Sequence, residues 1–427
     1  MRLTVALLLL AAAMPVAAAE IDAALDTKIQ DWRRDLHQHP ELGNRETRTA
    51  GVVAAHLKSL GLEPKTGIAH TGVTAVLRGG KPGPRIALRA DMDALPVTER
   101  VDLPFASKAT AQYRGETVGV MHACGHDAHT AILMGVAEAL VAQKDALAGE
   151  VLFLFQPAEE GPPEGEQGGA SLMLEEGVFR DFTPEAVFGL HVFSTLNVGT
   201  IGVREGPLMA ASDRFEIVVN GRQTHGSRPW GGVDPIAVAA ELIGGAQQIV
   251  SREMNISKQP VVVTFGAIKG GIRYNIIPDS VELVGTIRTF DEDMRKDVFS
   301  RLTRIADHTA AAHGATVQNR IPADEGNPVT RNDPALTAKM RPSLERIVGA
   351  DNVLDPGLTM GAEDFSYYAL EVPSMFFFVG ATPRGTDPVT APSNHSPEFF
   401  LDEEALKIGT RALHAVAVDY LAASKAN

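Results

Sequence analysis

The chain has 427 residues, which is more than one hydrophobic core usually accommodates, so we expect two domains or one large domain with an insert. Hydrophobic residues make up 44% and charged residues 22%, as in soluble globular proteins. The net charge of −14 argues against a nucleic-acid partner, because phosphate binding needs a basic face, and no stretch of the mature chain is apolar enough to span a membrane.

Residues 1–19 have the pattern of a secretory signal peptide. Arg2 is followed by the apolar run 5–13 and by the small residues 17–19. We therefore expect export, to a periplasm or alternatively by full secretion. The lone Cys124 forms no intrachain disulfide, and in an oxidising compartment a free thiol needs a reason to exist, such as a bound metal ion.

Two helices are predicted between residues 21 and 60, ending at Gly61. His37 and His39 lie between them. They are either metal ligands or part of a helix end that Pro40 closes, and the sequence leaves both readings open.

Four short apolar runs follow, and polar side chains come after each of them. Strands that are continuously apolar suit a sheet buried on both faces, and the active crevice of an open α/β sheet lies at the carboxyl ends of its strands. The runs are 85–90, 151–155, 186–190 and 375–379; the polar residues after them are Asp91, Asp93, Glu159, Glu160, His191 and His395. The sequence thus predicts that these groups meet at one edge of a sheet.

The stretch 121–129 contains three histidines, an aspartate and Cys124. Imidazole, thiolate and carboxylate are the ligands of Zn²⁺ and its first-row neighbours. The apolar spacing after it predicts a helix, so Cys124 and His126 lie near a helix amino terminus, which favours a thiolate. The alternative is an ordinary polar loop with a helix cap at Asp127.

The neighbouring acids Glu159 and Glu160 suggest a division of labour. On an extended backbone their side chains point to opposite sides, so one could bind metal and the other could accept a proton. Two metal ions about 3.5–4 Å apart can share a bridging water that attacks a carbonyl, and a general base removes its proton. The glycine- and proline-rich run 161–169 is predicted to be a surface loop at the edge of the cleft.

Between residues 207 and 322 the predicted order is β-α-β-β-α-β, the ferredoxin-like split. We therefore expect a discontinuous catalytic α/β domain, residues 20–206 and 323–427, with this α+β module inserted.

Several motifs together resemble the M20 metallopeptidase family, specifically its amidohydrolase branch, which includes hippurate hydrolases, N-acyl-amino-acid amidohydrolases and auxin-conjugate hydrolases. The matching segments are 37–41, 89–96, 121–129, 156–160, 189–192, 275–279, 360–365 and 394–399.

The resemblance implies a zinc-peptidase-like catalytic domain with an inserted lid or dimerisation domain. It implies two divalent metal ions (Mn, Zn, Ni or Co), general base Glu159, and Asp93 as an acid that orients a ligand. The implied metal ligands are Cys124, His126, Glu160, His191 and His395. Asp91 is doubtful as a ligand, because the wider family has a histidine at that position.

In the inserted domain, the resemblance implies that His225 polarises the substrate carbonyl, often across a dimer, so we expect a homodimer. Asn275, Arg288 and Gly361 are expected to bind substrate. The expected substrate is an N-acyl amino acid or short peptide.

Three other functions remain open from the residues alone. The chain could be a dipeptidase or carboxypeptidase of the same family. It could be a thiol hydrolase with Cys124 as nucleophile, or an exported metal-binding protein. A metal carrier has no use for a general base, so Glu159 speaks against the last of these.

Overall fold

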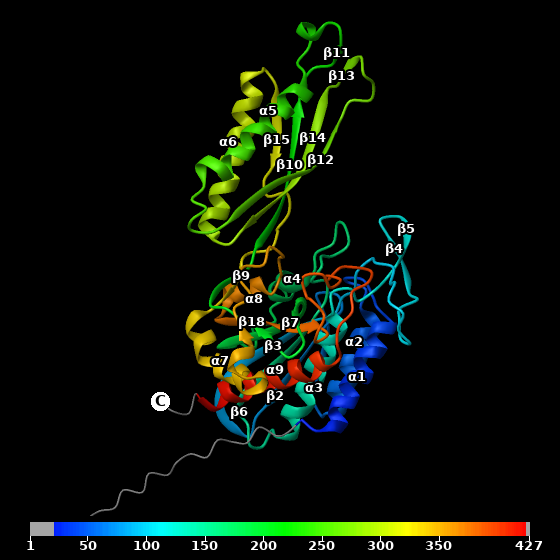
Figure 1. The fold of residues 1–427 in the computed structure, drawn as a ribbon, viewed down its shortest axis with the longest axis vertical. Coiled ribbons are helices and arrows are strands. Elements are labelled where there is room, and N and C mark those ends of the chain that lie inside the picture. Colours follow the sequence, from blue (N-terminus) through cyan, green and yellow to red (C-terminus); the bar gives the residue numbers. More distant parts are fainter. Residues whose placement is uncertain (1–20, 424–427) are drawn as a thin grey trace, which may run out of the picture.

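The computed structural model describes residues 21–423, so the predicted signal peptide lies outside the described residues. Figure 1 shows two lobes: a larger one built around a central sheet, and a smaller one with two helices against one face of a second sheet. The chain leaves the larger lobe after β9 (Gly206–Met209) and returns at β16 (Thr330–Asn332). These two strands pair antiparallel, so both crossings lie side by side.

The sheet of the larger lobe has the strand order β1-β2-β6-β3-β7-β18-β8-β17. Its centre consists of the four predicted strands, which run parallel to one another: β3 (Lys81–Asp91), β6 (Ala148–Gln156), β7 (Ala186–Asn197) and β18 (Ser374–Thr382). The edge strands are β1 (Lys65–Ile68), β2 (Gly72–Arg78), β8 (Ile201–Gly202) and β17 (Val353–Leu354). The prediction of an α/β sheet is confirmed.

Helices cover both faces of this sheet, which is why its central strands are apolar throughout. Ile86 and Leu88 of β3 belong to the core shared with α1, α2, α3, α7 and α9, whereas Ala87 belongs to the core shared with α4 and α8. The bounds are α1 (Ala23–Gln38), α2 (Thr47–Ser59), α3 (His126–Ala142), α4 (Gly169–Glu175), α7 (Pro334–Val348), α8 (Ser366–Glu371) and α9 (Glu404–Ala423).

A hairpin of β4 (Thr110–Tyr113) and β5 (Glu116–Gly119) projects from the larger lobe (Figure 1). Arg114 and Gly115 at its turn both have positive φ angles, 51° and 84°, as the tight turn of a two-residue hairpin requires. The sequence analysis did not predict this hairpin.

The inserted unit has the predicted ferredoxin-like order. Its antiparallel sheet runs β12-β14-β10-β15, and α5 and α6 pack against it. The bounds are β10 (Ala211–Asn220), α5 (Pro235–Gln248), β12 (Val261–Gly270), β14 (Ser280–Thr289), α6 (Glu292–Ala312) and β15 (Thr316–Arg320). Asp234 caps α5 and Asp291 caps α6 by accepting hydrogen bonds from the first-turn amides.

The predicted class, a catalytic α/β domain with an inserted α+β domain, is confirmed, while the exact boundaries at 207 and 322 stay a prediction. Among residues 21–423 we find no helix with the length and hydropathy needed to cross a bilayer.

Candidate metal centre and active site

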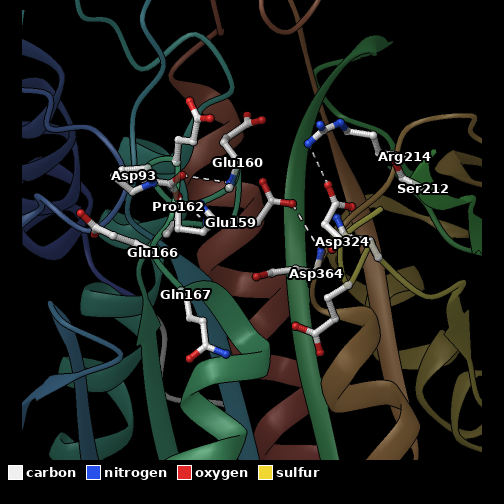
Figure 2. Close-up of a pocket in the computed structure, with 18 of the residues that line it drawn as sticks. Asp93, Glu159, Glu160, Pro162, Glu166, Gln167, Ser212, Arg214, Asp324 and Asp364 are labelled. Atoms are coloured by element: carbon white, nitrogen blue, oxygen red, sulfur yellow. Dashed lines mark hydrogen bonds and ion pairs between the residues drawn. The ribbon is translucent and has the colours of Figure 1, made fainter. Parts of the chain in front are cut away.

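A cleft of about 1520 Å³ lies between the two lobes. Asp93, Glu159 and Glu160 line it from the larger lobe, and Ser212 and Arg214 from the inserted unit (Figure 2). The predicted surface loop forms part of its rim, because residues 161–168 all line the cleft.

The metal-binding stretch folds as a tight entry into α3. Gly125 has φ 94°, and a Cβ at this position would lie 2.3 Å from Val192 Cγ2, so only glycine fits. His126 is the first residue of α3, as the sequence predicted. The turn therefore places Cys124 and His126 against β7, the strand that carries His191.

Three of the other predicted ligands lie around the Cys124 sulfur. Sγ lies 3.3 Å from His191 Nε2 and 3.2 Å from His395 Nε2. Glu160 Oε1 lies 2.9 Å from the same His395 nitrogen. His395 is held in a left-handed conformation with φ 72°, and its backbone N–H donates to the carbonyl of Ala123. Such strain in a non-glycine residue is typical of functional positions.

Two of the predicted ligands, His191 and His126, are oriented by contacts of their Nδ1 atoms, so that their Nε2 atoms are the ones available to bind a metal ion. His191 Nδ1 lies 2.7 Å from the Val192 carbonyl, which can only accept, so Nδ1 carries the proton. His126 Nδ1 lies 3.2 Å from Asp93 Oδ1. Asp93 also accepts the backbone N–H groups of Glu159 and Glu160, at 3.1 and 3.0 Å. Asp93 thus fixes one predicted ligand and both adjacent acids, as expected of an orienting residue.

The prediction that Glu159 and Glu160 lie on an extended backbone was wrong. They lie in a turn after β6, not on an extended strand, because Ala158 has φ 51°. The side chains nevertheless separate: Glu160 joins Cys124 and His395, whereas Glu159 joins Glu363 and Asp364. Ligand atoms of both glutamates also lie within 4.8 Å of His126.

The donor set fits divalent cations. His126 Nε2 is buried and forms no hydrogen bond within residues 21–423, and the buried Glu160 Oε1 contacts His395 Nε2 without the geometry of a hydrogen bond. Burial beside Glu160 and Glu159 raises the pKa of the Cys124 thiol well above its ordinary value. The helix amino terminus therefore does not produce a thiolate by itself, contrary to the sequence analysis, and a cation among these ligands is needed to do so.

Asp91, His129, His37 and His39 make other contacts in the larger lobe. Asp91 accepts from Arg89 at 2.7 Å and lies 2.6 Å from His129 Nδ1, while His129 Nε2 accepts the N–H of Val192. His37 is buried against Asp127. His39 ends α1 at the surface. Both oxygens of Asp91 have partners, although Asp91 also forms a candidate ligand group with His126 and His129. Neither His37 nor His39 belongs to such a group.

The predicted residues of the inserted unit do not reach this centre within one chain. His225 is on β11 (Thr224–His225), which pairs with β13 (Ile276–Ile277) at the end of the smaller lobe remote from the larger one (Figure 1). Asn275 precedes β13 and accepts the N–H of Gly226. Arg288 hydrogen-bonds Ser212 and Thr286, both of which line the cleft, but does not line it itself.

Gly361 also lies beside the cleft rather than in its wall, where the next residue, Ala362, is found. The carbonyl of Gly361 accepts the backbone N–H of Ala210, near the crossing into the inserted unit. Any contact of Gly361 with substrate stays a prediction.

A buried charge network next to the centre was missed by sequence reasoning. Arg89 of β3 is fully buried and contacts Asp91, Glu363 and Asp364. A signal was present, since an arginine inside a strand buried on both faces needs acidic partners. The sequence did not show which acids those were.

Comparison with known proteins agrees with this geometry. Residues 87–419 match the model of peptidase family M20/M25/M40. The chain is 39% identical over 398 residues to thermostable carboxypeptidase 2 of Saccharolobus solfataricus, covering 92% of this chain and 96% of the relative. It is 39% identical over 402 residues to N-acetylcysteine deacetylase of Bacillus subtilis, covering 93% and 98%.

A solved structure resembles the whole fold. It is the YXEP protein of Bacillus subtilis, described as a dinuclear metal-binding peptidase of the M20 family. The TM-score is 0.75 at 36% sequence identity, and the match covers 94% of this chain and 99% of that one.

Proposed function

The chain belongs to peptidase family M20/M25/M40 and is a metal-dependent hydrolase of amide C–N bonds. From this premise we propose its substrate class and the roles of its active-site residues. The proposed substrates are N-acyl amino acids or short peptides. The observation that carries the proposal is the gathering of one thiol, three imidazoles and Glu160 beside a second carboxylate, Glu159, whose side chain is only 7% exposed.

Cys124, His126, Glu160, His191 and His395 would hold two divalent ions, with Cys124 between His191 and His395. Such ions supply Lewis acidity, which lowers the pKa of water and polarises a carbonyl. Mn²⁺, Zn²⁺, Ni²⁺ and Co²⁺ all suit a mixed nitrogen, oxygen and sulfur set.

Glu159 acts as the general base. Burial, with the carboxylates of Glu363 and Glu160 nearby, raises the pKa of Glu159 well above its ordinary range, so this carboxylate readily takes up a proton. It accepts a proton from the attacking water and donates it to the leaving amine. The C–N bond breaks, the carbonyl carbon gains the hydroxyl, and the products are a carboxylic acid and a free amine.

The relatives favour both members of the proposed substrate class. One is named a deacetylase of an N-acetylated amino acid and another a carboxypeptidase. The deciding experiment strips the purified protein of metal and measures amino-acid release from N-benzoyl, N-acetyl and dipeptide substrates, with and without each of the four ions.

Release that returns only with metal supports the proposal and ranks the acyl groups. Release without metal would instead support a thiol hydrolase that uses Cys124. Stoichiometric metal binding without release from any substrate would favour a metal-binding protein, and would contradict the proposed substrates.

We further propose that the protein is a homodimer in which His225 serves the active site of the other subunit. Within one chain β11 is remote from the metal centre (Figure 1). Large apolar side chains near it are almost fully exposed: Trp230 at 80%, Ile272 at 97% and Tyr274 at 95%. Exposed apolar patches of this kind mark interaction surfaces.

Mixing two inactive variants tests this arrangement. His225→Ala and Glu159→Gln, unfolded together and refolded, should regain about a quarter of wild-type activity, because half of the dimers would be mixed and each would have one intact site. A mixture as inactive as its parents, or a monomer by light scattering, would contradict the proposal.

Export is also a proposal, supported by the pattern of residues 1–19. Cell fractionation in a bacterial host, with amino-terminal sequencing of the periplasmic product, tests it. A mature chain that begins at Glu20 agrees with it, and an intact Met1 in the cytoplasm contradicts it.

A further inference from the structure

The guanidinium of Arg89 joins two strands of the central sheet to the loop before α8. Nε donates to Gln156 Oε1 on β6 at 2.9 Å, and Nη1 donates to Asp91 Oδ2 on β3 at 2.7 Å. Nη2 donates to Glu363 Oε1 and to Asp364 Oδ1, both at 2.8 Å. The first two partners are fixed on strands of the sheet, so the segment that Arg89 restrains is the loop 361–365.

The same loop touches the proposed general base. The backbone N–H of Asp364 lies 3.4 Å from Glu159 Oε1 and donates to it. The side chain of Asp364 is fixed on its far side, since Oδ2 accepts the N–H of Ala170 at 2.8 Å. Asp364 and Glu159 lie next to each other among the residues that line the cleft (Figure 2).

Electrostatics would drive this loop away from Glu159 without a cation. Carboxylate oxygens of Glu159, Glu363 and Asp364 all lie within 4.8 Å of one another, and like charges at this distance repel. Within residues 21–423, Arg89 is the only cation in an ion pair with Glu363 or Asp364. It is fully buried, so solvent screens the attraction little.

We propose that Arg89, through Glu363 and Asp364, is a positioning residue for the general base: it holds the Asp364 amide against Glu159 and so fixes the carboxylate that moves the proton. This inference rests on the proposed role of Glu159. It assigns a role in the reaction to a residue that touches neither substrate nor the proposed metal ligands.

The experiment compares four variants of the full-length, metal-loaded protein. Arg89→Lys keeps the charge but loses the planar guanidinium that reaches four partners. Glu363→Ala removes one anchor of the loop, and Glu363→Gln keeps a hydrogen-bond acceptor in its place. Arg85→Lys, on the exposed part of the same strand, is the matched control.

With metal content equal to that of the wild type, Arg89→Lys and Glu363→Ala should lower kcat at least about 10-fold, since small misplacements of a catalytic group cost up to about 100-fold. KM should change less than about threefold, because these residues do not touch substrate. Arg85→Lys should keep kcat within about threefold of the wild type. Glu363→Gln also removes a charge beside Glu159, so its kcat should fall less than that of Glu363→Ala rather than stay unchanged.

Amide hydrogen exchange in the loop 361–365 provides a readout that does not depend on activity. Exchange should become faster in Arg89→Lys and Glu363→Ala and remain as in the wild type in Glu363→Gln. If the wild type hydrolyses no substrate, the proposed function is contradicted. Amide hydrogen exchange would still show whether Arg89 and Glu363 anchor the loop 361–365.

Wild-type exchange in both disruptive variants would overturn the inference. Faster exchange with unchanged kcat would overturn it too, because the loop would then be anchored without positioning the base. If Arg89→Lys does not fold, the pair Glu363→Ala and Glu363→Gln decides by the same criteria.

Discussion

The two lobes bury different kinds of residue. Within the described part of the inserted unit, Asp213 and Thr289 are the only buried polar side chains, and its core is otherwise aliphatic and aromatic. The larger lobe buries Arg33, Arg89 and Asp127 together with most of the residues of the proposed metal centre. The inserted unit is therefore stabilised mainly by apolar packing, whereas the larger lobe contains buried charges that each need a partner.

This difference indicates where the chain gives up stability for chemistry. Buried ions stabilise a fold little, even when paired, because desolvation offsets most of their attraction. Asp127 illustrates the point: although burial opposes it, Arg33 and His37 hold the pKa of this carboxyl well below its ordinary value. Such groups keep the metal loop in one conformation, and the inserted unit has no comparable cluster among its described residues.

The largest effect should come from the general base. Glu159→Gln keeps the volume of the side chain but cannot accept a proton, so turnover should fall about 10²–10⁴-fold, the usual contribution of a general base. Metal content by plasma mass spectrometry should be unchanged. Glu175→Gln, an exposed acid on α4, is the control. If Glu159→Gln turned over substrate at nearly the wild-type rate, Glu159 would not be the general base.

The inserted unit should respond to loss of packing rather than to loss of charge. Leu302 on α6 is fully buried, so Leu302→Ala should destabilise the inserted unit by about 2–5 kcal/mol. Metal stoichiometry, a property of the other lobe, should stay the same. Denaturant unfolding followed by circular dichroism measures the loss, with the exposed Lys296→Ala on the same helix as control. Equal stability of the two variants would contradict a separate apolar core.

A smaller, pH-dependent effect should come from a buried histidine in the larger lobe. Burial against α3 lowers the pKa of His414 from 6.5 to about 4, with Asp419 opposing the shift. As pH falls from 6.5 to 4, the unfolded chain takes up the proton first, so folding stability declines in this window, by up to about 3 kcal/mol. Above pH 6.5 His414 is neutral in both the folded and the unfolded chain, so it causes no further change in folding stability.

Unfolding measured at several pH values tests this expectation. His414→Gln should show a shallower decline between pH 6.5 and 4 than the wild type, whereas His308→Gln, an exposed histidine on α6, should not differ from the wild type. The same slope in all three proteins would show that His414 does not contribute.

Local patterns were enough to predict much of this structure. Continuous apolar runs gave the central strands, and their carboxyl ends led to Glu159, Glu160, His191 and His395. The helix spacing after residue 125 located His126 at the start of α3. These predictions depend on periodicity and on the geometry of parallel sheets, both of which the sequence carries locally.

The rest depends on contacts between distant segments. Arg89 and Glu363 are 274 positions apart, and the local sequence around either residue does not predict their contact. The turn at Ala158 arises where Glu46 accepts the Ala158 N–H, again a long-range contact. Asp91 and His129 were visible as candidate ligands, but only the structure shows that they bond each other.

The most direct test of the two-metal centre is a titration of the metal-stripped, full-length protein with whichever of the four ions best restores hydrolysis. Bound metal and initial rate are measured on the same samples. Five ligands grouped around Cys124 and His126 predict that two equivalents bind per chain and that the rate becomes maximal only with the second. A maximal rate at one equivalent, or binding of a single ion per chain, would contradict it.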